Sequence, residues 1–221
     1  MNTRTLTPRQ RGWIAGLSVW LILVSVACVA VISYYITSEV KQGIFTPSHF
    51  FGYFTVHMGL LFPAVYIAYA ALRPWQATLS ERRARWIHRL GIVQNCLAIY
   101  GLIILVVYWL IVSSPSEWKL DGWIVIHLVM PLTAIIAWLA TVRDGHLWWA
   151  SIPVGYILLY AAWTFAHGLT ASDHWFPYDF MDIVTYGLTT PTLVRICAIL
   201  AGVVIVSFAF TAIVTRKTTH R

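Results

Sequence analysis

The sequence predicts an all-α, polytopic transmembrane bundle, and three observations support this fold class. Of the 221 residues, 59% are hydrophobic and only 10% are charged, whereas soluble domains carry about 25% charged residues. The mean hydropathy is +0.73. The apolar residues form long uninterrupted runs, whereas a β-barrel would show segments of about ten residues in which apolar and polar positions alternate. The chain is therefore expected to be an integral membrane protein.

Six apolar segments are each long enough to cross a bilayer, which requires about 20 residues of α-helix. They lie at about 12–36, 49–72, 87–113, 122–142, 148–169 and 193–214. The first segment runs for about 25 residues, longer than the apolar core of a cleaved signal, so it is expected to remain as a helix. The connections are short and contain no repeat or low-complexity linker. The sequence thus predicts one six-helix domain over residues 1–221.

The net charge of +7 indicates a membrane orientation rather than nucleic-acid binding. Only Lys41, Lys119 and Arg195 fall on one face of the predicted membrane. The other basic residues fall on the opposite face: Arg4, Arg9, Arg11, Arg73, Arg82, Arg83, Arg85, Arg89, Arg143, Arg216, Lys217 and Arg221. Because basic residues accumulate on the cytoplasmic side, both termini are expected to be cytoplasmic. No nucleic acid is expected as a partner.

The cysteines and most of the histidines give no signal of a metal or cofactor site, and none is predicted. Cys28, Cys96 and Cys197 lie in different segments without C-x-x-C spacing, so zinc binding and thiol redox chemistry are not indicated. Gln94 and Asn95, in the inner half of the third segment, are predicted to form hydrogen bonds between helices. Five histidines at interfaces or in loops are assigned no chemistry: His49, His88, His146, His174 and His220.

Thr55 and His127 are polar residues inside apolar segments that both enter the membrane from the outer face. Thr55 lies six residues past His49, and His127 lies five residues past Gly122. A rise of about 1.5 Å per residue places them about 9 Å and about 7.5 Å deep, so their side chains are predicted to meet. Two structural interpretations stay open: a helix-packing threonine and a hydrogen-bonded buried histidine. His57, two residues after Thr55, is expected on nearly the opposite side of the helix.

Aromatic and charged residues are predicted to line the outer mouth of the same site. The connection over residues 170–192 is rich in aromatic residues, which is typical of an interfacial belt and also compatible with a lid over a cavity. Arg195, at the outer start of the last segment, is expected either to pair with Asp182 or to bind a substrate carboxylate. The residues expected to bind substrate are His57, His167, Tyr53, Trp175, Tyr178, Asp182 and Arg195.

Four segments of the chain resemble the androgen-induced-gene family, which comprises six-helix membrane proteins of animals and bacterial relatives. They are FFGYFT at 50–55, HLVMP at 127–131 with Trp138 downstream, GYILLY at 155–160 with Gly168, and WFPYDFMD at 175–182. The resemblance covers most of the chain. The animal members hydrolyse fatty acid esters of hydroxy fatty acids with a threonine nucleophile and a histidine, and the resemblance assigns these roles to Thr55 and His127. Bacterial members tend to have Gln-Ser-Asn after the threonine segment, where this chain has Val-His-Met.

The function that follows is lipid ester hydrolysis. His127 would take the proton of the Thr55 hydroxyl, whose oxygen attacks the ester and forms an acyl-enzyme that water then hydrolyses. Asp121, Tyr53 and Asp182 are candidates for the group that orients His127, and no sequence signal identifies the donors that would stabilise the oxyanion. The expected partners are a membrane lipid or fatty acid ester and the bilayer itself.

Two functions of other classes also fit the sequence. A haem-binding electron carrier would use two of His57, His127 and His167 as axial ligands inside the bundle. A transporter or scaffold without catalysis is the second alternative, although no acidic residue lies deep in a segment as proton-coupled transport would require. The chain has no Asn-x-Ser/Thr sequon in a predicted outer loop, which favours a bacterial inner membrane as its location.

Overall fold

The computed structural model describes residues 8–72, 81–113, 122–142 and 145–219. These residues contain helices and no strand, which confirms the predicted all-α class. The long helices are α1 (Pro8–Lys41), α3 (Phe54–Leu72), α4 (Glu81–Val107), α6 (Ser151–Thr170) and α7 (Thr190–Thr219), and α5 (Met130–Thr141) is shorter. Short elements between them are α2 (Pro47–Phe50), the π-helical turns η1 (Tyr108–Val112) and η3 (Val125–Val129), and the 3-10 turns η4 (Leu147–Ala150) and η5 (Asp179–Met181).

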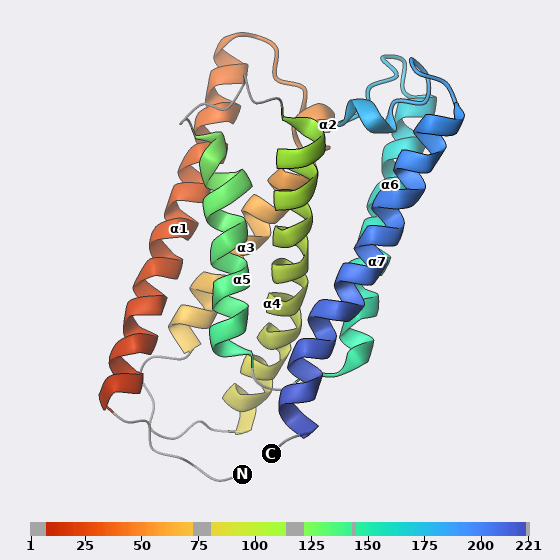
Figure 1. The fold of residues 1–221 in the computed structure, drawn as a ribbon. Helices are drawn as coiled ribbons and strands as arrows, with labels where there is room; N and C mark the ends of the chain where they lie inside the picture. The colour runs from red at the N-terminus through yellow and green to blue at the C-terminus, as the bar shows by residue number, and fades with distance from the viewer. Residues whose placement is uncertain (1–7, 73–80, 114–121, 143–144, 220–221) are drawn as a thin grey trace.

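Five of the helices are long and apolar enough to cross a membrane. They correspond to five of the six predicted segments. The segment predicted at 122–142 forms a shorter apolar helix, Val125–Thr141, which runs beside α3 and α4 in the bundle (Figure 1). The first turns of α1 and the last turns of α7 lie at the same end of the bundle (Figure 1). Most of the basic residues used to predict the orientation have side chains outside the described part of the chain.

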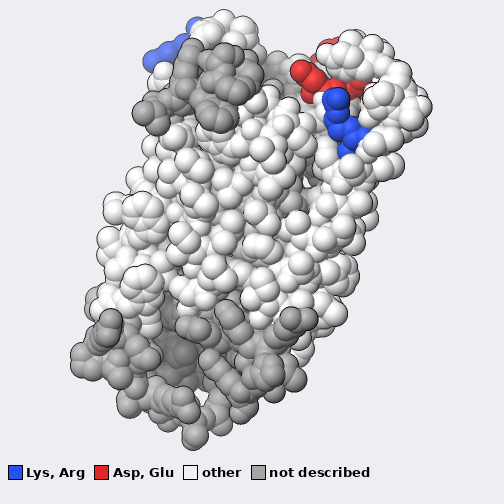
Figure 2. All heavy atoms as spheres, viewed as in Figure 1, with Lys and Arg blue, Asp and Glu red and all other residues white. Residues whose placement is uncertain are grey.

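The outward surface of the bundle is apolar, as expected of a protein surrounded by lipid. Val26 on α1, Leu159 on α6 and Ile205 on α7 expose 59%, 72% and 67% of their surfaces. Across the middle of the face shown in Figure 2, the described residues carry no Lys, Arg, Asp or Glu. Exposed leucine, isoleucine and valine at such a density would be unfavourable in water and are stable in hydrocarbon. The chain is therefore treated as an integral membrane protein.

The predicted hydrogen bonds of Gln94 and Asn95 between helices are confirmed. Asn95 accepts a hydrogen bond from the Trp138 indole at 3.1 Å and donates one to the Thr211 hydroxyl at 3.0 Å. The Gln94 carbonyl accepts the Thr141 hydroxyl at 3.1 Å. These buried contacts connect α4 with α5 and α7, although the Gln94 amide nitrogen has no partner among the described residues.

The second apolar segment contains a break that the sequence analysis did not predict. The helix expected over 49–72 is divided into α2, which ends at Phe50, and α3, which begins at Phe54. Trp175 occupies the space where a Cβ atom on Gly52 would lie, 2.5 Å from the indole ring. The Tyr160 hydroxyl donates to the Gly52 carbonyl at 2.8 Å, so that carbonyl is held by α6. The depth calculated for Thr55 along an unbroken helix was therefore wrong, and Thr55 lies in the first turn of α3.

The segment after α6 folds back onto the bundle at Gly168. A Cβ atom on Gly168 would lie 2.3 to 2.5 Å from the buried ring of Phe176. The aromatic connection therefore packs inward at this point and is not only a surface belt.

Gly168→Ala is expected to lower the free energy of unfolding by about 1 to 3 kcal/mol, because the ring of Phe176 must move to admit the methyl group. The matched control is Gly155→Ala on the same helix, where no atom lies within 4 Å of the added Cβ. Thermal unfolding in detergent compares the two variants. Equal midpoints would contradict the described packing of the connection on α6.

Candidate functional site

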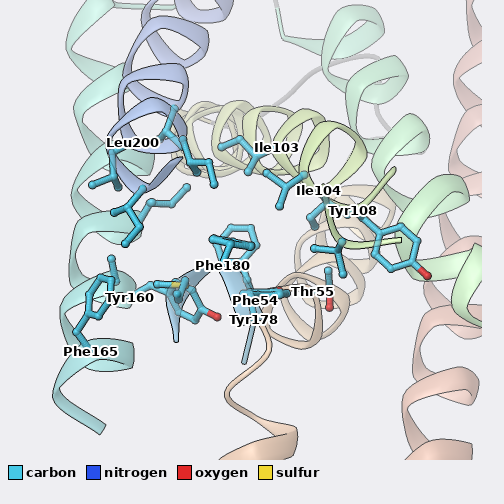
Figure 3. Close-up of a pocket in the computed structure, with 18 of the residues that line it drawn as sticks. Phe54, Thr55, Ile103, Ile104, Tyr108, Tyr160, Phe165, Tyr178, Phe180 and Leu200 are labelled. Atoms are coloured by element: carbon cyan, nitrogen blue, oxygen red, sulfur yellow. The ribbon is translucent and has the colours of Figure 1, made fainter. Parts of the chain in front are cut away.

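Two cavities meet at a wall that contains both Thr55 and His127. The first, of about 90 Å³, lies among α3, α4, α6 and α7 and is almost entirely apolar (Figure 3). The second, of about 500 Å³, has a mixed lining and is called the polar cavity because Tyr53, Asp179 and Arg195 contribute polar groups to it. The residues common to both cavities are Thr55, Tyr108, Val112, His127, Tyr178 and Phe180. The two residues singled out in the sequence thus stand where an apolar chamber joins a polar one.

Thr55 is buried, with 6% of its surface exposed, and lies in the first turn of α3. Ser25, a buried hydroxyl elsewhere in the bundle, donates to the carbonyl one turn earlier at 2.7 Å. Among the described residues no such bond is present for Thr55, and the Phe51 carbonyl one turn before it contacts Nε2 of His57. Thr55 is instead part of the walls of both cavities.

His127 is 4% exposed and is held in one tautomer by its own helix. Its Nδ1 lies 3.0 Å from the Trp123 carbonyl oxygen. A carbonyl only accepts, so Nδ1 carries the hydrogen, and in the neutral ring Nε2 carries the lone pair. The group that orients the His127 imidazole is therefore a main-chain carbonyl, and not Tyr53 or Asp182 as suggested from the sequence. Asp121, the third candidate, lies outside the described residues.

His127 lies in the π-helical turn η3, in which a backbone amide bonds to the carbonyl five residues earlier instead of four. Pro131 contributes, since it has no amide to donate to the His127 carbonyl one turn earlier. That carbonyl accepts the Trp109 indole at 3.1 Å instead. Single π-turns occur frequently at functional sites.

A second π-helical turn, η1, supplies the ring that packs on His127. Tyr108 stacks on the imidazole, with ring centroids 3.6 Å apart and an interplanar angle of 16°. Trp123 contacts the imidazole with its centroid at 5.3 Å. The ring is therefore fixed between aromatic neighbours as well as by its hydrogen bond. Tyr108 and Trp123 were not identified from the sequence, and no sequence signal marks them.

Tyr178 brings a phenol to the beginning of α3. Burial raises the pKa of the Tyr178 hydroxyl, and hydrogen bonding from the backbone of Phe54 and Thr55 opposes that rise. These amides belong to the first turn of a helix, where amide groups have no partner within the helix. The Tyr178 phenol remains neutral at physiological pH and is able to donate a hydrogen bond. Figure 3 shows Tyr178 beside Phe54 and Thr55 at the wall of the apolar cavity.

Three more of the predicted substrate-binding residues lie at or near the polar cavity. Tyr53 and Arg195 line it together with Asp179. Burial, together with the charges of Glu39 and Asp179, raises the pKa of Tyr53, which also stays a neutral phenol. Asp182 lies in the same connection, but its carboxylate accepts the backbone amides of Val184 and Thr185 at 3.1 and 2.8 Å. Within the described chain no Asp182–Arg195 ion pair is present, so the expected pairing was wrong.

The remaining predicted residues line neither cavity. Nδ1 of His57 lies 2.8 Å from the Tyr156 hydroxyl, and its Nε2 contacts the Phe51 carbonyl. His57 and Thr55 thus face different surroundings, as the helical spacing predicted. His167 and Trp175 lie outside the cavities beside His49. The three histidines considered as haem ligands have separate environments, and no observation favours an axial pair.

Comparison of the chain with protein-family models, with curated proteins and with solved structures finds no match. The resemblance to the androgen-induced-gene family accordingly stays a hypothesis. The argument for function depends on the geometry of the two cavities.

Proposed function

We propose that this chain is a membrane lipid esterase in which Thr55 is the nucleophile and His127 the general base. The observation that carries the proposal is that both residues lie in the shared wall of an apolar and a polar cavity. An ester with a long acyl chain is divided in a similar way, because its polar carbonyl group lies between an apolar tail and the alcohol portion of the molecule. The substrate class suggested by the family resemblance, fatty acid esters of hydroxy fatty acids, fits this division.

The acyl chain would occupy the apolar cavity between α4, α6 and α7. Its wall there consists of aliphatic residues such as Ile103, Ile157 and Leu200. The ester carbonyl would lie at the wall shared by the two cavities. A free carboxylate on the other half of the ester would reach Arg195 in the polar cavity, since guanidinium groups bind carboxylates strongly. This role for Arg195 replaces the ion pair with Asp182.

In the first half of the reaction, one proton moves from Thr55 to His127 and then to the leaving group. Nε2 of His127 takes the hydroxyl proton as the Thr55 oxygen bonds to the ester carbon. The alcohol leaves with that proton when the carbon–oxygen bond of the ester breaks, which leaves an acyl group on Thr55. His127 then takes a proton from water, whose oxygen bonds to the acyl carbon. The bond between that carbon and the Thr55 oxygen breaks as His127 returns the proton to this oxygen, which releases the fatty acid and restores the threonine.

Tyr178 is the proposed donor to the oxyanion. The carbonyl oxygen gains negative charge when the tetrahedral intermediate forms, and a nearby donor stabilises that charge. The oxygen of the neutral Tyr178 phenol accepts from the amides of Phe54 and Thr55, and Tyr178 lines the same cavity wall as the nucleophile. The positive end of the α3 helix dipole adds to the stabilisation.

The proposal also includes membership of the androgen-induced-gene family and the location of the chain in a cell membrane. The residues of the four resembling segments include Thr55, His127 and Tyr178, which share the cavity wall. A bacterial inner membrane, six crossings and cytoplasmic termini complete the proposed topology.

A hydrolysis assay with purified protein in detergent tests this function. The protein is expected to release free fatty acid from a fatty acid ester of a hydroxy fatty acid. Arg195→Gln is expected to raise the KM for this substrate about 10- to 100-fold, with little change for the same ester methylated at its carboxyl group, because an Arg–carboxylate contact contributes about 1.5 to 3 kcal/mol. Lys41→Gln, a change at an exposed cation at the end of α1, is the matched control. An absence of release above that of heat-denatured protein would contradict the proposed activity.

A further inference from the structure

Three side chains that commonly bind metal ions converge outside the two cavities. His49 lies in α2, His167 in the last turn of α6, and Asp173 in the segment that follows α6. One ligand atom from each lies within 4.8 Å of the other two. Nε2 of His49 and Oδ2 of Asp173 are 2.6 Å apart, which is a hydrogen-bond distance. The cluster thus joins residues that are more than a hundred positions apart in the sequence.

His167 contributes a ring nitrogen with an unsatisfied hydrogen-bonding requirement. Its Nε2 is buried, and among the described residues it has no hydrogen-bond partner. A buried polar atom without a partner is unfavourable, and one in a well-packed site calls for a bound water or ion. The imidazole of His49 and the carboxylate of Asp173 lie beside it.

Indole rings fix both imidazoles in place. Trp163 stacks on His167 at 5.4 Å and 10°, and Trp175 stacks on His49 at 4.3 Å and 11°. Trp175 also meets the edge of His167 at 6.3 Å. The ligand rings are therefore oriented before any ion binds, which lowers the entropic cost of binding.

We propose that His49, His167 and Asp173 bind one zinc ion, with water as the fourth ligand. Two imidazoles and one carboxylate are a donor set typical of zinc sites that keep one open position. The cysteine spacing, from which no metal site was predicted, gave no information on this cluster because none of its ligands is a cysteine.

The geometry requires only small side-chain movements. Zinc bonds of about 2.0 to 2.2 Å place tetrahedral ligand atoms about 3.3 to 3.5 Å apart. The His49–Asp173 pair would open slightly as zinc replaces the shared proton, and His167 would close on it.

Zinc binding would fasten the segment after α6 to the rest of the bundle. That segment carries Asp173 and, a few residues later, Tyr178 and Phe180 of the cavity wall. The ion would connect it to α2 and to the end of α6. This site stands apart from the esterase reaction, so its test needs no substrate.

Zinc titration of the full-length protein tests the site. Protein purified without a polyhistidine tag and stripped with a chelator is titrated with zinc chloride against a chromophoric competitor. We expect one zinc ion per chain and a higher thermal midpoint with zinc than without it. His167→Gln and Asp173→Asn should each weaken binding by at least about 100-fold, since even residues that only orient ligands contribute 10- to 100-fold.

His174→Asn is the matched control, because His174 lies in the same segment and its Nδ1 contacts the Gly168 carbonyl at 3.1 Å. Asparagine also tolerates the positive φ of 48° at this position. Cobalt in place of zinc should give the visible absorption of a four-coordinate ion in the wild type and in His174→Asn. Zinc binding of equal strength in His167→Gln and Asp173→Asn would overturn the proposal, as would a wild-type protein that binds none.

Discussion

Loss of either reacting side chain is expected to reduce lipid ester hydrolysis by about 10³- to 10⁴-fold, because a positioned nucleophile and its base each contribute rate factors of this size. Thr55→Ala removes the oxygen that forms the acyl-enzyme. His127→Ala removes the proton acceptor whose tautomer is set by the Trp123 carbonyl. kcat/KM for a fatty acid ester is the measurement.

The two variants have matched controls in the bundle. Thr133→Ala changes a buried threonine that accepts the Trp20 indole at 3.1 Å and lines neither of the two cavities. His88→Ala changes a histidine that packs against Trp149 at 5.5 Å. Both controls should retain activity. Added imidazole should partly restore His127→Ala, since it would enter the space left by the ring, whereas it should not restore Thr55→Ala. Retained hydrolysis in Thr55→Ala would contradict the assigned nucleophile.

Tyr178→Phe is expected to lower kcat by about 10²- to 10³-fold with little change in KM, because loss of one oxyanion donor affects the transition state and not the bound ester. The ring remains in the cavity wall, so the change tests the hydroxyl alone. Tyr186→Phe, in the same connection and 56% exposed, is the control. A rise in KM at constant kcat would show that Tyr178 only binds substrate.

The fold class and part of the packing were predictable because they depend on composition and local periodicity. Continuous apolar runs require helices in a membrane, whatever the partner helices are. Gln94 and Asn95 were expected to make contacts between helices because an amide in hydrocarbon requires a partner, and the contacts are present.

Features that tertiary contacts create were not predictable from the same signals. The break before α3 depends on Trp175 and Tyr160, which lie more than a hundred residues away. That break places Thr55 at a helix start, where the amides and Tyr178 are found. Pro131 is visible in the sequence, but the π-turn before it and the contact of His127 Nδ1 with the Trp123 carbonyl are visible only in the structure.

The candidate site itself was predicted in part. Thr55 and His127 do line common cavities, although the calculated depth of Thr55 was wrong. Tyr53, Tyr178 and Arg195 lie on the cavity walls, whereas the other predicted contacts do not. Residues outside the long helices, such as His49 in the single turn α2, have no periodicity to indicate which neighbour they meet. The proposed metal site of His49 depends on the contact of α2 with α6 and with the segment that follows α6.

The most direct test of the central claim is mass-spectrometric mapping of a covalent adduct formed with an alkyl fluorophosphonate, which reacts with activated hydroxyl nucleophiles. The wild type should carry the phosphonate on Thr55, Thr55→Ser should still react, and Thr55→Ala and His127→Ala should not. An adduct on another residue, or equal labelling of Thr55→Ala and the wild type, would contradict the assignment of Thr55 and His127.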